Sequence, residues 1–209
     1  SKEFTKDNLK EGLKQAGISE SKIYDKSVLD RAEKELKRQY TSRGFYSSKV
    51  SITVTPLERN RVSLRFDIEE GEITRIADIN IIGAKDFGER ELLRQMQLTT
   101  PGWLTWITKD DQYSKQKLTG DLESLRSFYL NRGYLESNIE STQVSITPDR
   151  EKIYITVALN EGPVYRLGDI KFSGDLIVPE RELRELVAMA PGETFSRQRV
   201  IESVKRITD

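Results

Sequence analysis

The stretch Leu118-Thr-Gly-Asp-Leu-Glu-Ser-Leu125-Arg-Ser-Phe-Tyr129-Leu-Asn-Arg132-Gly133-Tyr134 decides the fold, because an earlier part of the chain repeats its pattern. Six of its residues have a counterpart 89 positions earlier, and these counterparts are Leu29, Leu36, Tyr40 and Arg43-Gly44-Phe45. Six matches at one spacing indicate an internal repeat, which has to be recognised before any fold is assigned.

Further motifs return 90 or 91 positions later. They are Val62, Ile68 and Glu70-Gly71, which return as Ile153, Leu159 and Glu161-Gly162; Ile76–Gly83, which returns as Leu167–Gly174; and Pro101-Gly102, which returns as Pro191-Gly192. We therefore divide the chain into three repeats. The first repeat (residues 1–72) lacks an initial strand, the middle repeat (residues 73–163) is complete, and the last repeat (residues 164–209) begins a further copy.

Hydrophobic periodicity predicts a strand and two helices at the start of the middle repeat. Ile79 and Ile81 alternate with polar residues, which is typical of a short strand. A helix then ends before Pro101-Gly102. We expect the second helix to begin near Asp110 or Asp111, because carboxylates suit a helix N-terminus. It should end at Gly133, which can adopt the left-handed conformation at little cost.

Two strands complete the middle repeat. The last of them shows strict alternation, with apolar residues at Ile153, Ile155, Val157 and Leu159. The order strand, helix, helix, strand, strand predicts an α+β fold. In each module, two antiparallel helices should cover one face of a three-stranded mixed sheet.

Composition excludes several classes of function. The chain has 34 Lys plus Arg and 34 Asp plus Glu, so it lacks the basic excess that nucleic acid attracts. It contains no cysteine and no histidine, which removes triad hydrolysis, thiol catalysis and most zinc or iron sites. We therefore expect no enzyme activity, no cofactor, no metal site and no nucleic-acid partner.

The repeat resembles the POTRA domains of the Omp85 family of outer-membrane barrel-assembly proteins. The resemblance rests on Arg-Gly-Phe or Arg-Gly-Tyr before the second strand and on Glu-Gly after the third. Residues 116–127, 131–134 and 141–148 resemble the third POTRA domain of such a protein, and residues 55–62 resemble the second. The remainder resembles the start of the fourth.

The resemblance implies a function and a location. It implies a periplasmic scaffold that is part of an outer-membrane protein with its own C-terminal membrane barrel. The partners that it implies are unfolded outer-membrane proteins, received as strands at an exposed sheet edge, and accessory lipoproteins such as BamB, a propeller protein that docks on the third domain.

The second strand is where the first and middle repeats differ. The apolar residues of the first repeat keep one parity, and they are Val50, Ile52 and Val54. Their counterparts, with three residues inserted, are Ile139, Val144 and Ile146. An odd insertion reverses the face of every later side chain. A β-bulge within residues 140–143 would return Val144 and Ile146 to the core face.

Bulges are common at sheet edges, so we predict an exposed edge strand at residues 143–147 that binds partners by β-augmentation. Replacing Ser145 with proline should then remove a donor from this edge. The alternative is a structural bulge beside a solvated edge. The candidate partner-binding residues are Gln143, Val144, Ser145, Ile146, Thr147 and Leu98.

Other residues have both a functional and a structural interpretation. Trp103 and Trp106 could anchor a partner, but such residues more often close the end of a core. The acidic pairs Asp110-Asp111 and Glu69-Glu70 could act as acid and base, but a helix start and a turn explain them better. We expect Arg43 and Arg132 to contact a carboxylate or a carbonyl oxygen.

Three alternative functions remain for comparison. A POTRA array of a two-partner secretion transporter would carry two units in the whole protein. An enzyme would need a nucleophile beside a base, and no motif supplies this pair. A KH-like RNA-binding domain would need a Gly-x-x-Gly clamp, which the sequence lacks.

Overall fold

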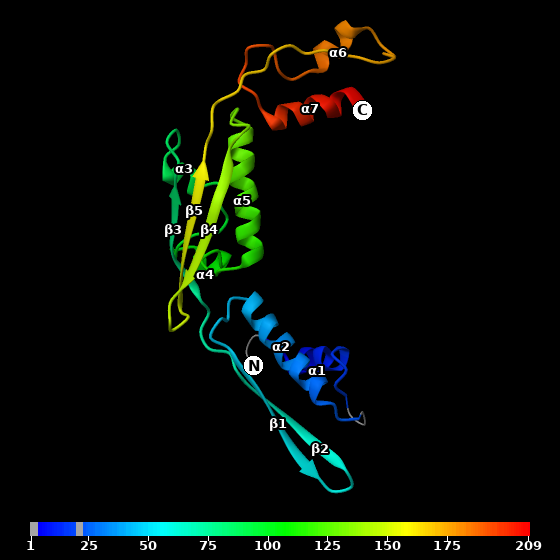
Figure 1. The fold of residues 1–209 in the computed structure, drawn as a ribbon, viewed down its shortest axis with the longest axis vertical. Helices are drawn as coiled ribbons and strands as arrows, with labels where there is room; N and C mark the ends of the chain where they lie inside the picture. Colours follow the sequence, from blue (N-terminus) through cyan, green and yellow to red (C-terminus); the bar gives the residue numbers. More distant parts are fainter. Residues whose placement is uncertain (1–3, 20–22) are drawn as a thin grey trace. The chain divides into compact units, whose positions relative to one another are not determined.

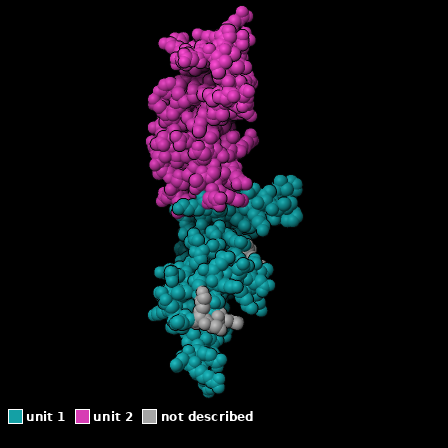
Figure 2. All heavy atoms as spheres, turned by 90° about the vertical axis from the view of Figure 1, so that its right-hand side faces the viewer, with its two compact units in different colours: residues 1–77, 100–115, 145–154 teal, residues 78–99, 116–144, 155–209 magenta. Residues whose placement is uncertain are grey.

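The computed structural model describes residues 4–19 and 23–209. The helices and strands follow the repeated order (Figure 1). They are α1 (Lys6–Gln15), α2 (Lys26–Ser42), β1 (Lys49–Leu57), β2 (Arg61–Glu69), β3 (Arg75–Ile82), α3 (Glu89–Leu93), α4 (Thr105–Thr108), α5 (Lys115–Leu130), β4 (Asn138–Ile146), β5 (Lys152–Asn160), α6 (Glu180–Leu186) and α7 (Arg197–Thr208). The chain divides into two compact units, coloured in Figure 2. Unit 1 comprises residues 1–77, 100–115 and 145–154, and unit 2 comprises residues 78–99, 116–144 and 155–209.

The first repeat packs two capped helices on an antiparallel hairpin. Thr5 caps α1 by accepting a hydrogen bond from the backbone N–H of Asn8 (3.2 Å), and Asp25 caps α2 in the same way. Strands β1 and β2 pair in register from Lys49 opposite Glu69 to Leu57 opposite Arg61. The core of this repeat is formed by Leu36, Tyr40, Phe45 and Val50. Burial of each such apolar side chain contributes about 1.5–3 kcal/mol.

The middle repeat contains the predicted three-stranded mixed sheet, in the order β3-β5-β4. Strands β3 and β5 run in the same direction and β4 runs in the opposite one (Figure 1). The alternation predicted for the last strand is confirmed, because Ile153, Ile155, Val157 and Leu159 are all buried. The α+β fold predicted from the repeat is therefore correct.

The second helix of the middle repeat begins later than predicted. Helix α5 starts at Lys115, and Asp111 does not cap it. Instead, the Asp111 side chain is completely buried and forms an ion pair with Arg75. Aspartate is common at helix N-termini, but Asp111 instead pairs with Arg75, which lies 36 positions away in the sequence. The predicted end of this helix is confirmed, since Gly133 has a φ angle of 91°.

The Glu-Gly motif has a structural role that the sequence did not reveal. The buried carboxylate of Glu161 accepts hydrogen bonds from the backbone N–H groups of Lys85 (2.9 Å) and Asp86 (3.1 Å) and from the hydroxyl group of Tyr129 (2.9 Å). Gly162 then turns the chain with a φ angle of 69°. Glu161 therefore ties the loop after β3 to helix α5.

The last repeat contains α6 and α7. Residues 167–174, which correspond to β3 by sequence, form no strand. In the middle repeat β3 pairs with β5, and no strand of the described chain pairs with residues 167–174. Across residues 4–19 and 23–209, no helix combines the length and apolar character that a membrane span requires.

Candidate functional site

Strand β4 lies at one edge of the sheet in the middle repeat. In the part of the chain that the structure describes, β5 is the only strand paired with it. The backbone N–H of Thr147 donates to the carbonyl oxygen of Lys152 (3.0 Å), which places these two residues opposite each other. Backbone groups alternate in direction along an antiparallel strand. The N–H groups of Val144 and Ile146 therefore point away from β5, and the N–H of Ser145 points toward it.

This geometry corrects one expectation from the sequence. Replacing Ser145 with proline was expected to remove a donor from the open edge. Because the N–H of Ser145 faces β5, this change would instead break a hydrogen bond inside the sheet. The donors that a partner could use are those of Val144 and Ile146.

The side chains of Val144 and Ile146 stay exposed, although the strand register places them on the predicted core face. Their exposed fractions are 39% and 42%. Counting back from the pair formed by Thr147 and Lys152, Ile146 lies opposite Ile153 and Val144 lies opposite Ile155. Opposite residues share a face of the sheet, so both side chains are on the core face. They remain exposed because nothing in the described chain covers the edge of β4.

The burial pattern of β4 supports the predicted bulge. Its half-buried residues are Ile139 and Thr142, which lie three positions apart. Regular strand geometry would place them on opposite faces, so one additional residue lies between them. Residues 140–141 fall within the range predicted for the bulge.

The other edge of the sheet is partly closed, in contrast to β4. On β3, the backbone N–H of Ile76 donates to the carbonyl oxygen of Asp111 (2.8 Å). The backbone N–H of Ile81 donates to the Glu89 carboxylate (3.1 Å). Strand β4 is therefore the edge that is better able to accept another chain.

The side chain of Thr147 forms hydrogen bonds within the turn that joins β4 to β5. Its hydroxyl group donates to the Asp149 carboxylate (2.5 Å) and accepts a hydrogen bond from the backbone N–H of Lys152 (3.0 Å). The first of these bonds is the main reason why the pKa of Asp149 is lowered. Arg150 adopts the left-handed conformation, with a φ angle of 62°, and its guanidinium group donates to the carbonyl oxygen of Tyr46 (2.9 Å). This turn therefore anchors one end of the β4 edge within unit 1.

Leu98 is not part of the exposed edge. Its side chain is only 1% exposed, and its backbone N–H donates to the Asp121 carboxylate (2.9 Å). A partner could not reach this side chain, so the prediction of a binding role for Leu98 finds no support in its position. Of the predicted residues, Gln143, Val144, Ser145 and Ile146 form the exposed β4 edge.

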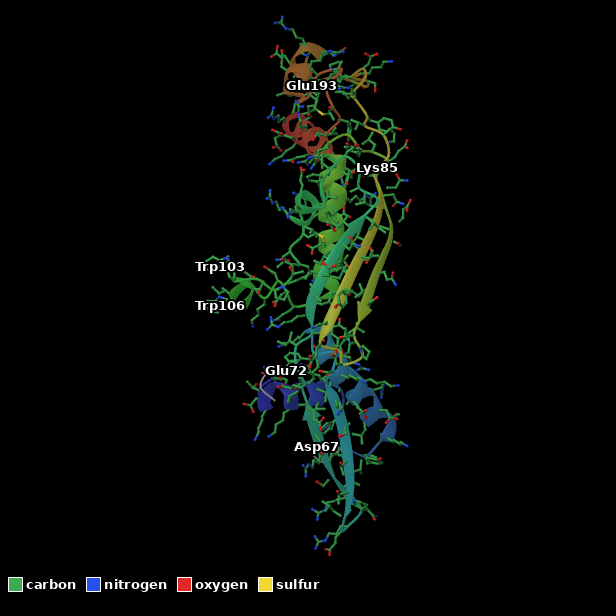
Figure 3. All side chains as sticks on the ribbon, turned by 90° about the vertical axis from the view of Figure 1, so that its left-hand side faces the viewer. Asp67, Glu72, Lys85, Trp103, Trp106 and Glu193 are labelled. Atoms are coloured by element: carbon green, nitrogen blue, oxygen red, sulfur yellow. The ribbon has the colours of Figure 1, made fainter. Side chains whose placement is uncertain are left out.

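The two tryptophans are exposed, and the interpretation that they close the core is wrong. Trp103 is 84% exposed and Trp106 is 76% exposed. Figure 3 shows both side chains on the α4 segment, pointing away from the ribbon. They are available for contact with another molecule.

The remaining polar candidates have structural roles. Arg132 donates to the carbonyl oxygen of Phe128 (3.2 Å) and stacks over its ring at 3.6 Å, which confirms the predicted carbonyl contact. Arg43 stacks over the Phe4 ring at 4.2 Å. Glu69 forms an exposed ion pair with Lys49 (3.2 Å).

The repeated modules and the open edge of the middle sheet define a tandem array of small α+β domains. The chain belongs to the POTRA family. The family model described as "POTRA: Surface antigen variable number repeat" matches residues 1–71, 74–162 and 165–209.

Curated relatives are outer-membrane assembly factors. The chain is 35% identical over 195 residues to the outer membrane protein assembly factor BamA of Neisseria meningitidis serogroup B, covering 93% of this chain and 24% of that protein. It is 27% identical over 197 residues to the BamA of Buchnera aphidicola, covering 94% of this chain and 32% of that protein. The chain thus spans between about a quarter and a third of these two relatives.

A solved structure shows the same fold. POTRA domains 3–5 of Haemophilus influenzae BamA align with 98% of this chain and 80% of that chain, with a TM-score of 0.54 and 14% sequence identity. At this identity, the likeness supports the architecture alone.

Proposed function

We propose that this chain is a periplasmic, protein-binding scaffold of outer-membrane protein assembly, within a larger protein that ends in a membrane barrel. The names of the curated relatives support this role, since they are outer membrane protein assembly factors. Membership of the POTRA family along the whole chain supports it as well.

The β4 edge is the proposed binding site. One observation carries this assignment: the outward N–H groups of Val144 and Ile146 lie beside their own exposed apolar side chains. An added strand would satisfy the backbone groups whatever its sequence and would also cover the two side chains. The proposed partners are strands of unfolded outer-membrane proteins and accessory lipoproteins such as BamB, because tolerance of sequence suits a receiver of many clients.

The number of repeats favours this role over two-partner secretion. A secretion array of that type would carry two units, whereas the family model matches three segments of this chain.

Replacing Val144 with proline tests the binding mode. This change removes an outward N–H, and edge strands tolerate proline where the N–H faces solvent. Val144→Thr is the matched control, because it keeps the N–H and the β-branched shape but adds a polar group. We expect Val144→Pro to weaken binding of a purified BamB homologue and of an amphipathic strand peptide by about tenfold, which corresponds to about 1.4 kcal/mol. Unchanged binding of both probes by a folded Val144→Pro protein would refute the proposed site.

A further inference from the structure

Four large apolar side chains are exposed next to one another on the turn that contains α4. Trp103, Leu104, Trp106 and Ile107 are 84%, 46%, 76% and 60% exposed. We call residues 103–107 the apolar turn. Single exposed apolar residues are common, but contiguous patches of this kind mark sites of interaction.

The apolar turn is held in a defined conformation by its one buried residue. The hydroxyl group of Thr105 donates to the carbonyl oxygen of Gly102 (2.7 Å) and accepts from the N–H of the same residue (3.1 Å). The backbone N–H of Lys109 donates to the carbonyl oxygen of Thr105 (2.8 Å). Lys109 is the C-cap of α4 and adopts the left-handed conformation. The polar side chain of Thr105 therefore faces inward, while the apolar ones face solvent.

The segment that contains the apolar turn carries no charged side chain. Residues 95–108 contain no Asp, Glu, Lys or Arg, although these types make up 33% of the chain. The first charged residues after this run are Lys109 and Asp110, which carry opposite charges. The nearby carboxylate of Asp111 is buried and paired with Arg75, so it adds no exposed negative charge.

This charge pattern fits a lipid surface better than a protein. The apolar centre of a protein interface is normally surrounded by a polar rim. The apolar turn instead follows a segment without charged side chains, and an adjacent pair of opposite charges, Lys109 and Asp110, comes after it. Tryptophan has a large apolar ring and one N–H donor, and it is enriched where a bilayer meets water.

We propose that the apolar turn inserts into the headgroup region of a phospholipid bilayer and attaches this part of the chain reversibly to a membrane surface. Trp103 and Trp106 would lie at the boundary between headgroups and acyl chains, and Lys109 would face the lipid phosphates. This binding site is separate from the β4 edge and does not depend on it.

Tryptophan fluorescence tests whether the apolar turn binds lipid. The chain contains two tryptophans, and both lie in the apolar turn, so tryptophan emission reports on this site alone. We expect vesicles of phosphatidylethanolamine and phosphatidylglycerol to shift the emission to shorter wavelength. Lipids brominated on their acyl chains should quench it. Emission that vesicles leave unchanged would overturn the proposal.

A double substitution tests the role of the turn and preserves the two reporters. Leu104→Ser combined with Ile107→Ser should weaken partition into vesicles about tenfold, which corresponds to about 1.4 kcal/mol. Ile177→Ser is the matched control, because Ile177 is fully exposed in the last repeat and should leave partition unchanged. Equal loss in both variants would overturn the proposal. A shift in tryptophan emission that depends on protein concentration in the absence of lipid would also overturn the proposal. The apolar turn would then bind a second copy of the chain.

Discussion

The guanidinium group of Arg75 contacts the carboxylate of Asp111, which is completely buried. Arg75 begins strand β3, and Asp111 lies in the loop before helix α5. One carboxylate oxygen of Asp111, Oδ1, has no hydrogen-bond partner among residues 4–19 and 23–209. The ion pair is thus the main compensation for a buried negative charge, and it fixes the loop against the start of the sheet.

Replacing Arg75 with alanine should therefore destabilise the protein strongly. Removal of one partner leaves a buried charge without compensation, and we expect the free energy of unfolding to fall by about 3 kcal/mol. Adding Asp111→Asn should restore at least about 1 kcal/mol, because the side chain left behind is then neutral. Urea unfolding of the two single variants and the double variant measures this coupling. Simple addition of the two losses would show that the pair does not interact energetically.

The register of β4 predicts a contrast between two neighbouring prolines. Ser145→Pro should lower the free energy of unfolding by about 1–3 kcal/mol more than Val144→Pro, because only the N–H of Ser145 faces β5. Urea unfolding of both variants makes the comparison, and each serves as the control for the other. If Val144→Pro were the more damaging change, the alternation inferred from Thr147 and Lys152 would be wrong.

The fold could be predicted from the sequence because its determinants are local and repeated. The alternation from Ile153 to Leu159 and the turn at Gly133 depend on neighbouring residues, and both are confirmed. The roles of Asp111 and Glu161 could not be predicted in this way. Their partners lie 36 and 76 positions away, so no local pattern reveals them.

The candidate site was only partly predictable. The inserted residues before Val144 located the edge strand, because an odd insertion changes the parity of a strand. Burial could not be read from parity, because exposure at an edge depends on what covers it. For this reason Val144 is exposed although it lies on the core face, and Trp103 is exposed although its residue type favours a core.

Two glycines in equivalent positions of the repeat should tolerate alanine differently. Gly44 and Gly133 both have a φ angle of 91°. A Cβ atom at Gly44 would have its nearest neighbours at 3.6 Å, whereas one at Gly133 would lie 2.8 Å from the carbonyl oxygen of Tyr165. The shared φ angle should cost both variants about 1–2 kcal/mol. We expect Gly133→Ala to be the more destabilising change because of the additional clash.

Thermal or urea unfolding of the two alanine variants tests this difference, and Gly44→Ala controls for the backbone strain that both share. Equal losses would mean that the segment around Tyr165 moves away from Gly133 at no cost.

Stability should fall in alkaline solution because of the tyrosines around Glu161. The hydroxyl group of Tyr134 donates to the Asp86 carboxylate (2.8 Å). Burial and this hydrogen bond raise the pKa of Tyr134 from its ordinary value of 10 to about 12. Burial and the hydrogen bond to Glu161 also raise the pKa of Tyr129. The folded state therefore favours the protonated phenols more than the unfolded state does.

This stabilisation is complete below about pH 10 and is lost as the pH rises from 10 toward 12, because the unfolded chain ionises first. Tyr134→Phe should lower stability at neutral pH by about 1 kcal/mol, since it removes a hydrogen bond, but should reduce the alkaline loss. Urea unfolding between neutral pH and pH 12 measures both effects, with Tyr154→Phe as the control because Tyr154 is exposed. An alkaline loss of the same size in Tyr134→Phe and in the unmodified protein would show that this phenol does not contribute to the pH dependence.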